Sequence, residues 1–140
     1  MSTCDIDFAD HYDTNDGDPC DFFVVVTITS ARKTHRCLEC RGEIAKGESY
    51  QRANYKFEGK LYSDARCQSC EEAATEFGYP MYDGCFWESM REQWAEGAHI
   101  TACVQRLSTV RAKVLMVAQW RRWKDLDVEQ APNPPSEGAP

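Results

Sequence analysis

The sequence lacks long apolar runs, and this absence argues against a membrane-spanning helix. The longest run is FFVVVTI at Phe22–Ile28, whereas a span needs about 20 apolar residues. The N-terminus also lacks the basic region of a secretory signal, because it opens with Asp5, Asp7 and Asp10. We therefore expect a cytoplasmic protein with no membrane partner.

Whole segments lack charge of one sign. Residues 1–21 hold seven aspartates and no basic residue, whereas Arg106–Lys124 holds six basic residues and no acid. Ser30–Cys67 is also net basic, although the chain carries a net charge of −7. An acidic chain disfavours indiscriminate nucleic-acid binding, but the two basic segments leave local binding open.

Composition divides the chain into four segments. Residues 1–21 are predicted to form a flexible acidic arm, because they are polar and rich in Asp. Residues 22–79 are predicted to form a zinc-binding module and residues 80–126 a helical region. Residues 127–140 contain four prolines and are predicted to be a disordered tail.

Strand signals come before helix signals, which predicts an α+β fold. Phe22–Ser30 is dense in β-branched and aromatic residues and predicts a strand. The segment 49–66 predicts a β-hairpin that turns at Glu58 and Gly59. Four aromatic residues would supply its packing surface: Tyr50, Tyr55, Phe57 and Tyr62.

Three helices are expected after the hairpin. The first covers Cys70–Gly78, where early acids and alanines favour a helix that Gly78 ends. The second ends at Gly97, and its apolar residues fall at helical spacing: Phe86, Trp87, Met90 and Trp94.

The third is one long amphipathic helix over Ala98–Lys124. Its apolar seam advances in steps of three and four residues: Ile100, Cys103, Leu107, Val110, Val114 and Val117. We interpret the seam as a core-facing surface; the alternative is a seam that pairs with a second chain and makes an oligomer.

Two Cys-x-x-Cys pairs are the strongest chemical signal. Cys37 and Cys40 form the first pair, and Cys67 and Cys70 form the second. Zinc prefers four ligands in a tetrahedron, and two such turns complete the shell with thiolates. The spacing therefore predicts one structural Zn²⁺ ion, which leaves no open position for water or substrate.

Three alternatives to zinc at these pairs are a rubredoxin-like iron site, a thioredoxin-type redox pair and disulfides. The two pairs lie in unlike sequences and lack a βαβ context, and a reducing compartment disfavours disulfides. His35 is not counted among the four ligands, but it is a candidate to donate a hydrogen bond to one of the thiolates. Cys103 is expected in the core, and a second metal site from Cys4, His11 and Cys20, with Cys85, is a weaker alternative.

The segment Ala31–Cys70 reads ARKTHRCLECRGEIAKGESYQRANYKFEGKLYSDARCQSC. It resembles a treble-clef zinc finger, in which a first cysteine turn (the knuckle) is followed by a hairpin and by a second ligand pair that enters a helix. A His two places before the first Cys, an I-x-x-G-E turn and a hairpin aromatic make it similar to small zinc-binding proteins encoded by bacteriophages. This resemblance implies a four-Cys zinc module, and residence in the bacterial host cytoplasm.

No enzyme is expected. Treble-clef nucleases carry catalytic histidines on the hairpin and helix, but Tyr50–Phe77 contains none. We expect a protein-interaction factor, which in a phage would bind and modulate or inhibit a host protein such as a defence or nucleic-acid enzyme. The alternative is a nucleic-acid-binding protein that uses the basic hairpin and a basic helix. The helix would supply six binding residues: Arg106, Arg111, Lys113, Arg121, Arg122 and Lys124.

Overall fold

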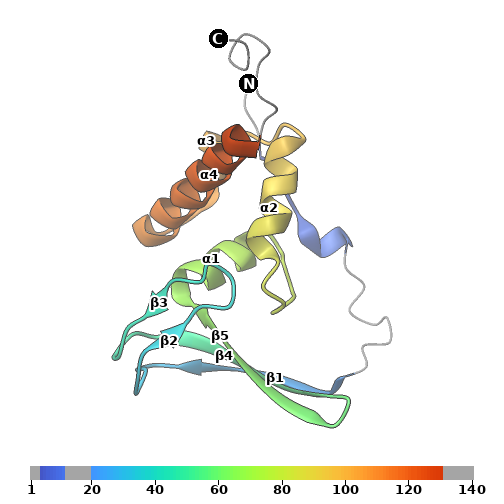
Figure 1. Ribbon diagram of the computed structural model, residues 1–140, viewed down its shortest axis with the longest axis vertical. Coiled ribbons are helices and arrows are strands. Elements are labelled where there is room, and N and C mark those ends of the chain that lie inside the picture. Colours follow the sequence, from blue (N-terminus) through green and yellow to red (C-terminus); the bar gives the residue numbers. More distant parts are fainter. Residues whose placement is uncertain (1–3, 12–19, 131–140) are drawn as a thin grey trace, which may run out of the picture.

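The computed structural model describes residues 4–11 and 20–130, with side chains at 4–9 and 23–125. The strands are β1 (Cys20–Ile28), β2 (His35–Arg36), β3 (Glu43–Ile44), β4 (Tyr50–Phe57) and β5 (Lys60–Cys67). The helices are η1 (Phe8–His11, a 3-10 helix), α1 (Gln68–Glu76), α2 (Phe86–Ala95), α3 (Ile100–Arg106) and α4 (Val110–Gln130). The described part is therefore α+β, as the sequence predicts. The sheets lie at one end of the molecule, the later helices at the other, and α1 between them (Figure 1).

The larger sheet has three antiparallel strands in the order β1-β4-β5. β1 pairs with β4, with Val25 opposite Ala53, and β5 pairs with β4 as a hairpin. The short strands β2 and β3 form a separate antiparallel pair around the first cysteine turn. The expected strand and hairpin are both present, and the pairing of β1 with β4 joins them into one sheet.

The hairpin turns at Glu58 and Gly59, as predicted. Both residues have positive φ, 50° and 80°, which is the conformation of the two-residue turn that matches strand twist. The hairpin aromatics pack along the sheet, because the Tyr55 ring stacks on Tyr62 with centroids 5.1 Å apart. Tyr50 is buried at the other end of β4. The hairpin thus extends from the knuckles as an aromatic-lined ribbon.

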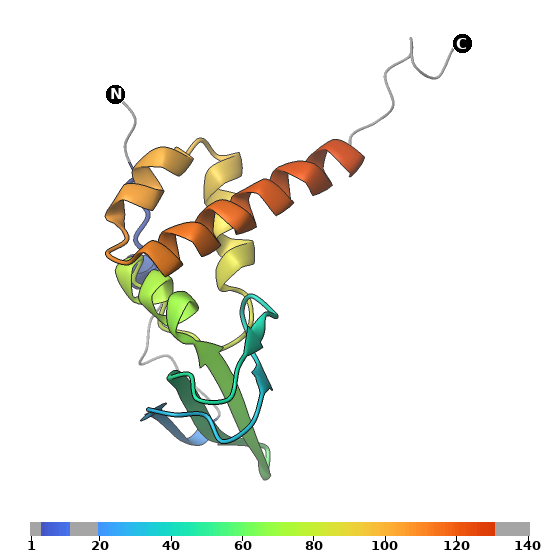
Figure 2. The same cartoon turned by 90° about the vertical axis from the view of Figure 1, so that its left-hand side faces the viewer.

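The main apolar core lies among the helices. The four apolar residues expected on α2 are all buried, and Phe86 packs edge-on against Trp87 and Tyr79. α4 contacts α1, α2 and α3, and it crosses this group and continues beyond it (Figure 2). The helical end therefore buries more apolar surface than the sheet end does.

Residues 4–9 of the acidic arm pack against the body. Ile6 and Phe8 are buried, and the Phe8 N–H donates to the Phe77 carbonyl at 2.8 Å. Gly78 has φ of 72°, and a Cβ there would lie 2.7 Å from an Asp7 carboxylate oxygen. The apolar residues of this segment find partners that composition does not reveal; residues 12–19 lie outside the described part.

The expected single helix over 98–124 is two helices, and this prediction was wrong. Leu107 is extended (φ −79°, ψ 144°) and separates α3 from α4. The Thr109 hydroxyl then accepts from the Ala112 N–H at 3.2 Å and caps α4. A local cap therefore replaces helix continuation at this point. α4 also extends to Gln130, into the predicted tail; residues 131–140 lie outside the described part.

The predicted seam is also only partly correct. Cys103 on α3 and Leu107 just after it are buried, but Val110 and Val114 are 74% and 63% exposed. Among the described side chains of α4, the buried ones are Ala112, Met116 and Gln119. The break after α3 resets the helical phase, so the face that packs on the body is not the continuation of the α3 seam.

A buried ion pair connects the two cysteine turns to α2. Arg66 Nη2 lies 2.9 Å from Glu39 Oε2, and both side chains are almost fully buried. The other Glu39 carboxylate oxygen accepts from the Phe86 N–H at 3.1 Å, at the start of α2. The Arg66 guanidinium also lies over the Tyr82 ring, 3.7 Å from its centroid. Burial raises the pKa of Glu39, and Arg66 opposes this shift.

We predict that Arg66→Met destabilises the metal-loaded protein by about 3–5 kcal/mol, because it leaves the Glu39 carboxylate buried without its partner. Urea unfolding followed by circular dichroism measures the change. The matched control is Arg111→Met, whose ion pair with Glu72 is partly exposed and should contribute within about 1 kcal/mol. Equal effects of the two substitutions would contradict this role for Arg66.

Candidate metal centre

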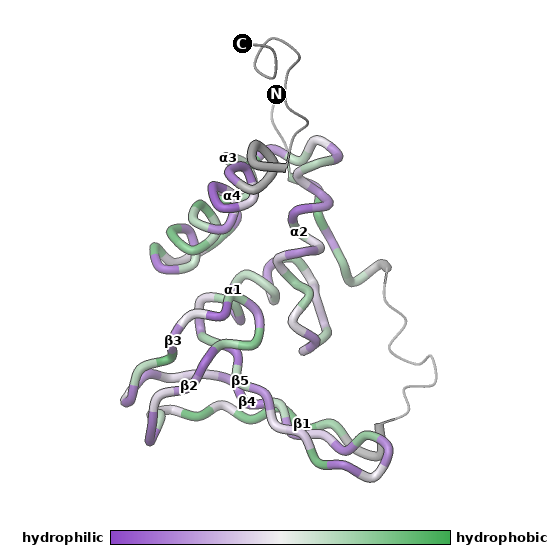
Figure 3. The backbone as a smooth tube through the Cα atoms, in the orientation of Figure 1, coloured by the Kyte–Doolittle hydropathy of each residue, from purple (hydrophilic) through white to green (hydrophobic). Residues whose placement is uncertain are grey.

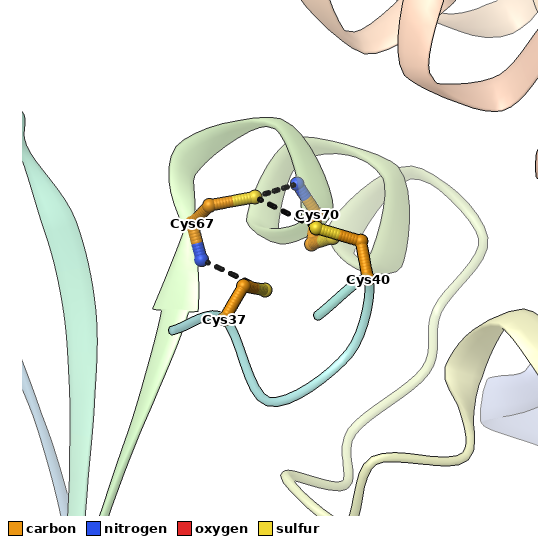
Figure 4. A group of neighbouring side chains, drawn as sticks. All are labelled: Cys37, Cys40, Cys67 and Cys70. Atoms are coloured by element: carbon orange, nitrogen blue, oxygen red, sulfur yellow. Dashed lines mark hydrogen bonds between the residues drawn. The ribbon is translucent and has the colours of Figure 1, made fainter. Parts of the chain in front are cut away.

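The two Cys-x-x-Cys pairs meet at one point, as the sequence predicts. Four sulfur atoms lie within 4.8 Å of one another, and they belong to Cys37, Cys40, Cys67 and Cys70 (Figure 4). In the described part of the chain no other group of three or more His, Cys, Asp or Glu side chains comes this close. The cluster can therefore hold a metal ion.

The first pair sits in the turn between β2 and β3. The Cys37 N–H donates to the Gly42 carbonyl at 2.8 Å, and the Leu38 N–H donates to Ala65 on β5 at 2.7 Å. A Cβ at Gly42 would lie 3.2 Å from the Cys40 sulfur. The absence of a side chain there lets the backbone approach this sulfur closely.

The second pair sits where β5 becomes α1. Cys67 is the N-cap of α1, and its sulfur accepts from the Cys70 N–H at 3.4 Å. Cys70 lies in the first turn of the helix and is fully buried. A strand end and a helix start thus hold this pair, so both sulfurs are fixed by regular structure.

Each sulfur accepts one hydrogen bond from an N–H group. The Cys67 N–H donates to Cys37 Sγ at 3.3 Å, and the Gly42 N–H donates to Cys40 Sγ at 3.3 Å. The Trp87 indole N–H donates to Cys70 Sγ at 3.3 Å. With the Cys70 N–H bond to Cys67, all four sulfurs have a donor. Donors of this kind stabilise thiolates over thiols, which is the protonation state that a metal requires.

The sulfur spacing fits tetrahedral ligation. Four sulfurs about 2.3 Å from a central ion lie about 3.8 Å apart, and the Cys40 and Cys67 sulfurs are 3.9 Å apart. Without a cation the thiols compete for protons: hydrogen bonds from Cys40, Cys67 and Cys70 lower the pKa of Cys37. The hydrogen bond with Cys37 in turn raises the pKa of Cys70. Four thiolates can coexist here only around a positive ion.

Comparison of the chain with protein-family models, curated proteins and solved structures finds no match. The candidate site therefore rests on the geometry of this chain, and the resemblance to phage zinc proteins gains no support from a relative. In the described residues, no helix combines the length and apolar composition needed to cross a membrane.

Sequence reasoning missed Trp87 as a partner of the cluster. His35, which it favoured, lies 3.2 Å from the Tyr50 hydroxyl through Nε2. Burial and the positive charges of Arg52 and Lys33 lower the pKa of His35. Trp87 is 17 positions beyond Cys70, on a helix whose aromatic residues indicate only a core face. No spacing rule connects an indole to a thiolate at that separation.

The other predicted site residues divide into two groups. Arg106 contacts Glu76, Arg111 contacts Glu72, and Lys113 donates to the Val104 carbonyl at 3.3 Å. These three make contacts within the chain, and their role in a binding surface stays a prediction. The remaining three are exposed near the end of α4: Arg121, Arg122 and Lys124.

The weaker alternative of a second metal site finds no cluster in the described side chains. Cys4 lies beside Cys103, and the Cys85 thiol is directed to the Asp83 carbonyl at 3.7 Å. The side chains of His11 and Cys20 lie outside the described part. Cys103 is buried in the core, as expected.

We predict that Trp87→Phe weakens metal binding by about tenfold or more, because it removes the donor to Cys70 and keeps most of the ring. Competition with a chromogenic chelator, with Zn²⁺ as the probe ion, measures the change. The control is Trp94→Phe, an equal truncation on the same helix, whose indole N–H makes no hydrogen bond to any of the four cluster sulfurs. Equal affinities for the two variants would show that the indole N–H contributes nothing.

Proposed function

We propose that the chain is a non-catalytic protein-interaction factor built on one structural Zn²⁺ ion in a treble-clef module. The observation that carries the zinc module is the closed cluster: four sulfurs within 4.8 Å of one another, each with its own N–H donor. Structural zinc sites have this ligand set.

The order of elements supports the treble-clef assignment. A cysteine turn lies between β2 and β3, a hairpin of β4 and β5 follows, and the second cysteine pair starts α1. The two pairs lie in different local structures, since the first is in a loop and the second is at the start of a helix. This asymmetry favours zinc in a treble clef over an iron site with two similar knuckles.

The ligand set disfavours catalysis. Four thiolates fill the coordination shell, so no position remains for a substrate or an activated water. Of the two histidines whose side chains are described, His35 contacts Tyr50 and the exposed His99 precedes α3. A hydrolytic site would need a general base beside the metal, whereas the side chains that meet at this cluster are the four cysteines.

The interaction role rests on apolar surface that the fold does not cover. β1 is an edge strand, and four consecutive residues of it are 38–49% exposed: Phe23, Val24, Val25 and Val26. Leu61, on the opposite edge strand, is 75% exposed. Figure 3 shows the hydrophobic stretch of β1 at the sheet end of the molecule. Exposed apolar groups gathered on one element are typical of protein-binding surfaces, and uncharged edge strands accept added strands.

A second candidate function, nucleic-acid binding, is favoured by the end of α4. Arg121, Arg122 and Lys124 are exposed, and no ion pair among the described side chains involves them. The Lys124 ammonium lies 5.0 Å from the Trp123 ring centroid. Cations beside aromatic rings can engage phosphates and bases together.

To test the interaction role, we would capture partners of the tagged chain from a nuclease-treated bacterial lysate. We predict that Val24→Lys reduces the captured protein by about tenfold or more, because an unpaired ammonium is costly in an apolar interface. The matched control is Val114→Lys, which makes the same change at an exposed valine of α4. A partner lost equally from both variants, or from neither, would exclude β1 as the interface.

The nucleic-acid alternative makes a separate prediction. If α4 binds phosphates, the affinity of the chain for a fluorescent single-stranded oligonucleotide should decrease as the salt concentration is raised from about 50 to about 200 mM. The double variant Arg121→Gln, Arg122→Gln should bind more weakly still and show a shallower salt dependence. Arg111→Gln is the control, since this arginine is engaged by Glu72. Salt-independent binding, or none, would remove this candidate.

A further inference from the structure

Two cysteines outside the metal cluster lie in contact. The sulfurs of Cys4 and Cys103 are 2.6 Å apart, although the residues are 99 positions apart in the sequence. Both are free cysteines. A disulfide requires a sulfur separation of about 2.05 Å, so a shift of about half an ångström would bring the pair to bonding distance. No spacing rule in the sequence connects these two residues.

The surroundings of the pair distinguish its two members. Cys4 is half-buried and Cys103 is fully buried on α3. Arg106 Nη1 lies 3.5 Å from the Cys4 sulfur. The hydrogen bond from Cys103 and the contact with Arg106 lower the pKa of Cys4 to about 6, against the effect of burial. The same hydrogen bond raises the pKa of Cys103. One accessible thiolate thus faces one protected thiol, which is the arrangement of an attacking and a resolving cysteine.

The pair also joins the N-terminal segment to the body. Arg106 Nη1 donates to the carbonyls of Cys4 and Ile6 at 3.0 and 2.9 Å. The Arg106 guanidinium lies over the Phe77 ring, 4.3 Å from its centroid, and pairs with Glu76. Figure 2 shows the blue N-terminal segment beside α3 and the end of α1. These contacts add to the burial of Ile6 and Phe8, and a covalent bond at Cys4 would restrict the start of the segment further.

We propose that Cys4 and Cys103 form a redox modification site, in which a small-molecule disulfide such as oxidised glutathione converts the two thiols to an intramolecular disulfide. The Cys4 thiolate attacks one sulfur of the oxidant, forms a mixed disulfide and releases one glutathione thiolate. Cys103 then loses its proton and attacks the Cys4 sulfur, which releases the second glutathione. The two protein thiols are oxidised, and the glutathione disulfide is reduced to two thiols. The product locks residues 4–9 onto α3.

The other described cysteines have reasons not to react. The four cluster sulfurs are each hydrogen-bonded to an N–H group and would be ligated by the metal ion, which leaves them less available for attack. Among the described side chains, the charges that act on Cys85 are those of Asp83, Glu88 and Glu39 and not of a cation, and its thiol faces the Asp83 carbonyl. Cys85 is therefore the matched single-cysteine control for Cys4.

The test incubates the zinc-loaded full-length chain with reduced and oxidised glutathione at a series of ratios, then blocks free thiols and maps peptides by mass spectrometry. We expect a peptide in which Cys4 is linked to Cys103, at near-full yield in oxidising buffer, with one zinc ion retained per chain. Cys85→Ser should leave this product unchanged, and Cys4→Ser should abolish it and retain zinc. A wild-type map in which Cys4 stays free, or in which the link forms only after zinc is removed, would overturn the proposal.

A second readout tests the lock itself. Hydrogen exchange at the amides of residues 5–9 should slow by about tenfold or more on oxidation of the wild-type chain, because the disulfide opposes local opening. The Cys4→Ser variant should show no such change between the two buffers. If the disulfide forms and exchange in this segment is unaltered, the proposed locking of the segment is wrong.

Discussion

Four cysteine sulfurs held within 4.8 Å of one another form the constraint on which the rest of the fold depends. As thiolates they would repel one another without a cation, and the sheet end has little apolar core of its own to offset that repulsion. Its fully buried apolar residues are few, Ile44 and Ala53 among them, and β1 leaves several apolar side chains exposed. Metal binding supplies folding free energy outright in modules of this kind. Ligation can thus replace the apolar burial that the sheet lacks.

The Arg66–Glu39 pair carries this constraint into the helical end. Glu39 lies between the two cysteines of the first turn, and Arg66 immediately precedes the second pair. Closing the cluster therefore brings the backbones at these two residues close together, and the second Glu39 oxygen accepts a hydrogen bond from the first turn of α2. Trp87, one residue further along α2, reaches the Cys70 sulfur. The start of α2 is thus fixed twice to the cysteine cluster, which connects the aromatic core to the small sheet.

Local signals in the sequence were enough to predict the cysteine cluster, the hairpin with its Glu58–Gly59 turn, and the apolar face of α2. Each depends on residues close in sequence or on a ligand rule with fixed spacing. Contacts over long separations were not predictable: Trp87 with Cys70, Cys4 with Cys103, and the docking of Ile6 and Phe8. The prediction of one continuous helix through Leu107 failed for another reason. The apolar period continues through it, and the Thr109 cap outweighs that period only because the chain turns there to pack α4 on α1.

The cysteines of this chain separate into two chemical environments, and the difference lies in their donors. The cluster sulfurs receive neutral N–H groups, which favour thiolates without making a strong counter-ion, so a metal cation is still needed to complete the charge balance. Cys4 receives a guanidinium, which balances its charge already and leaves a stabilised, nucleophilic sulfur with no requirement for metal. Arg106 reaches Cys4 only because the N-terminal segment docks beside α3. The fold can thus keep the proposed metal-binding thiols and the proposed redox pair in separate environments within one small protein, provided that the N-terminal segment stays docked.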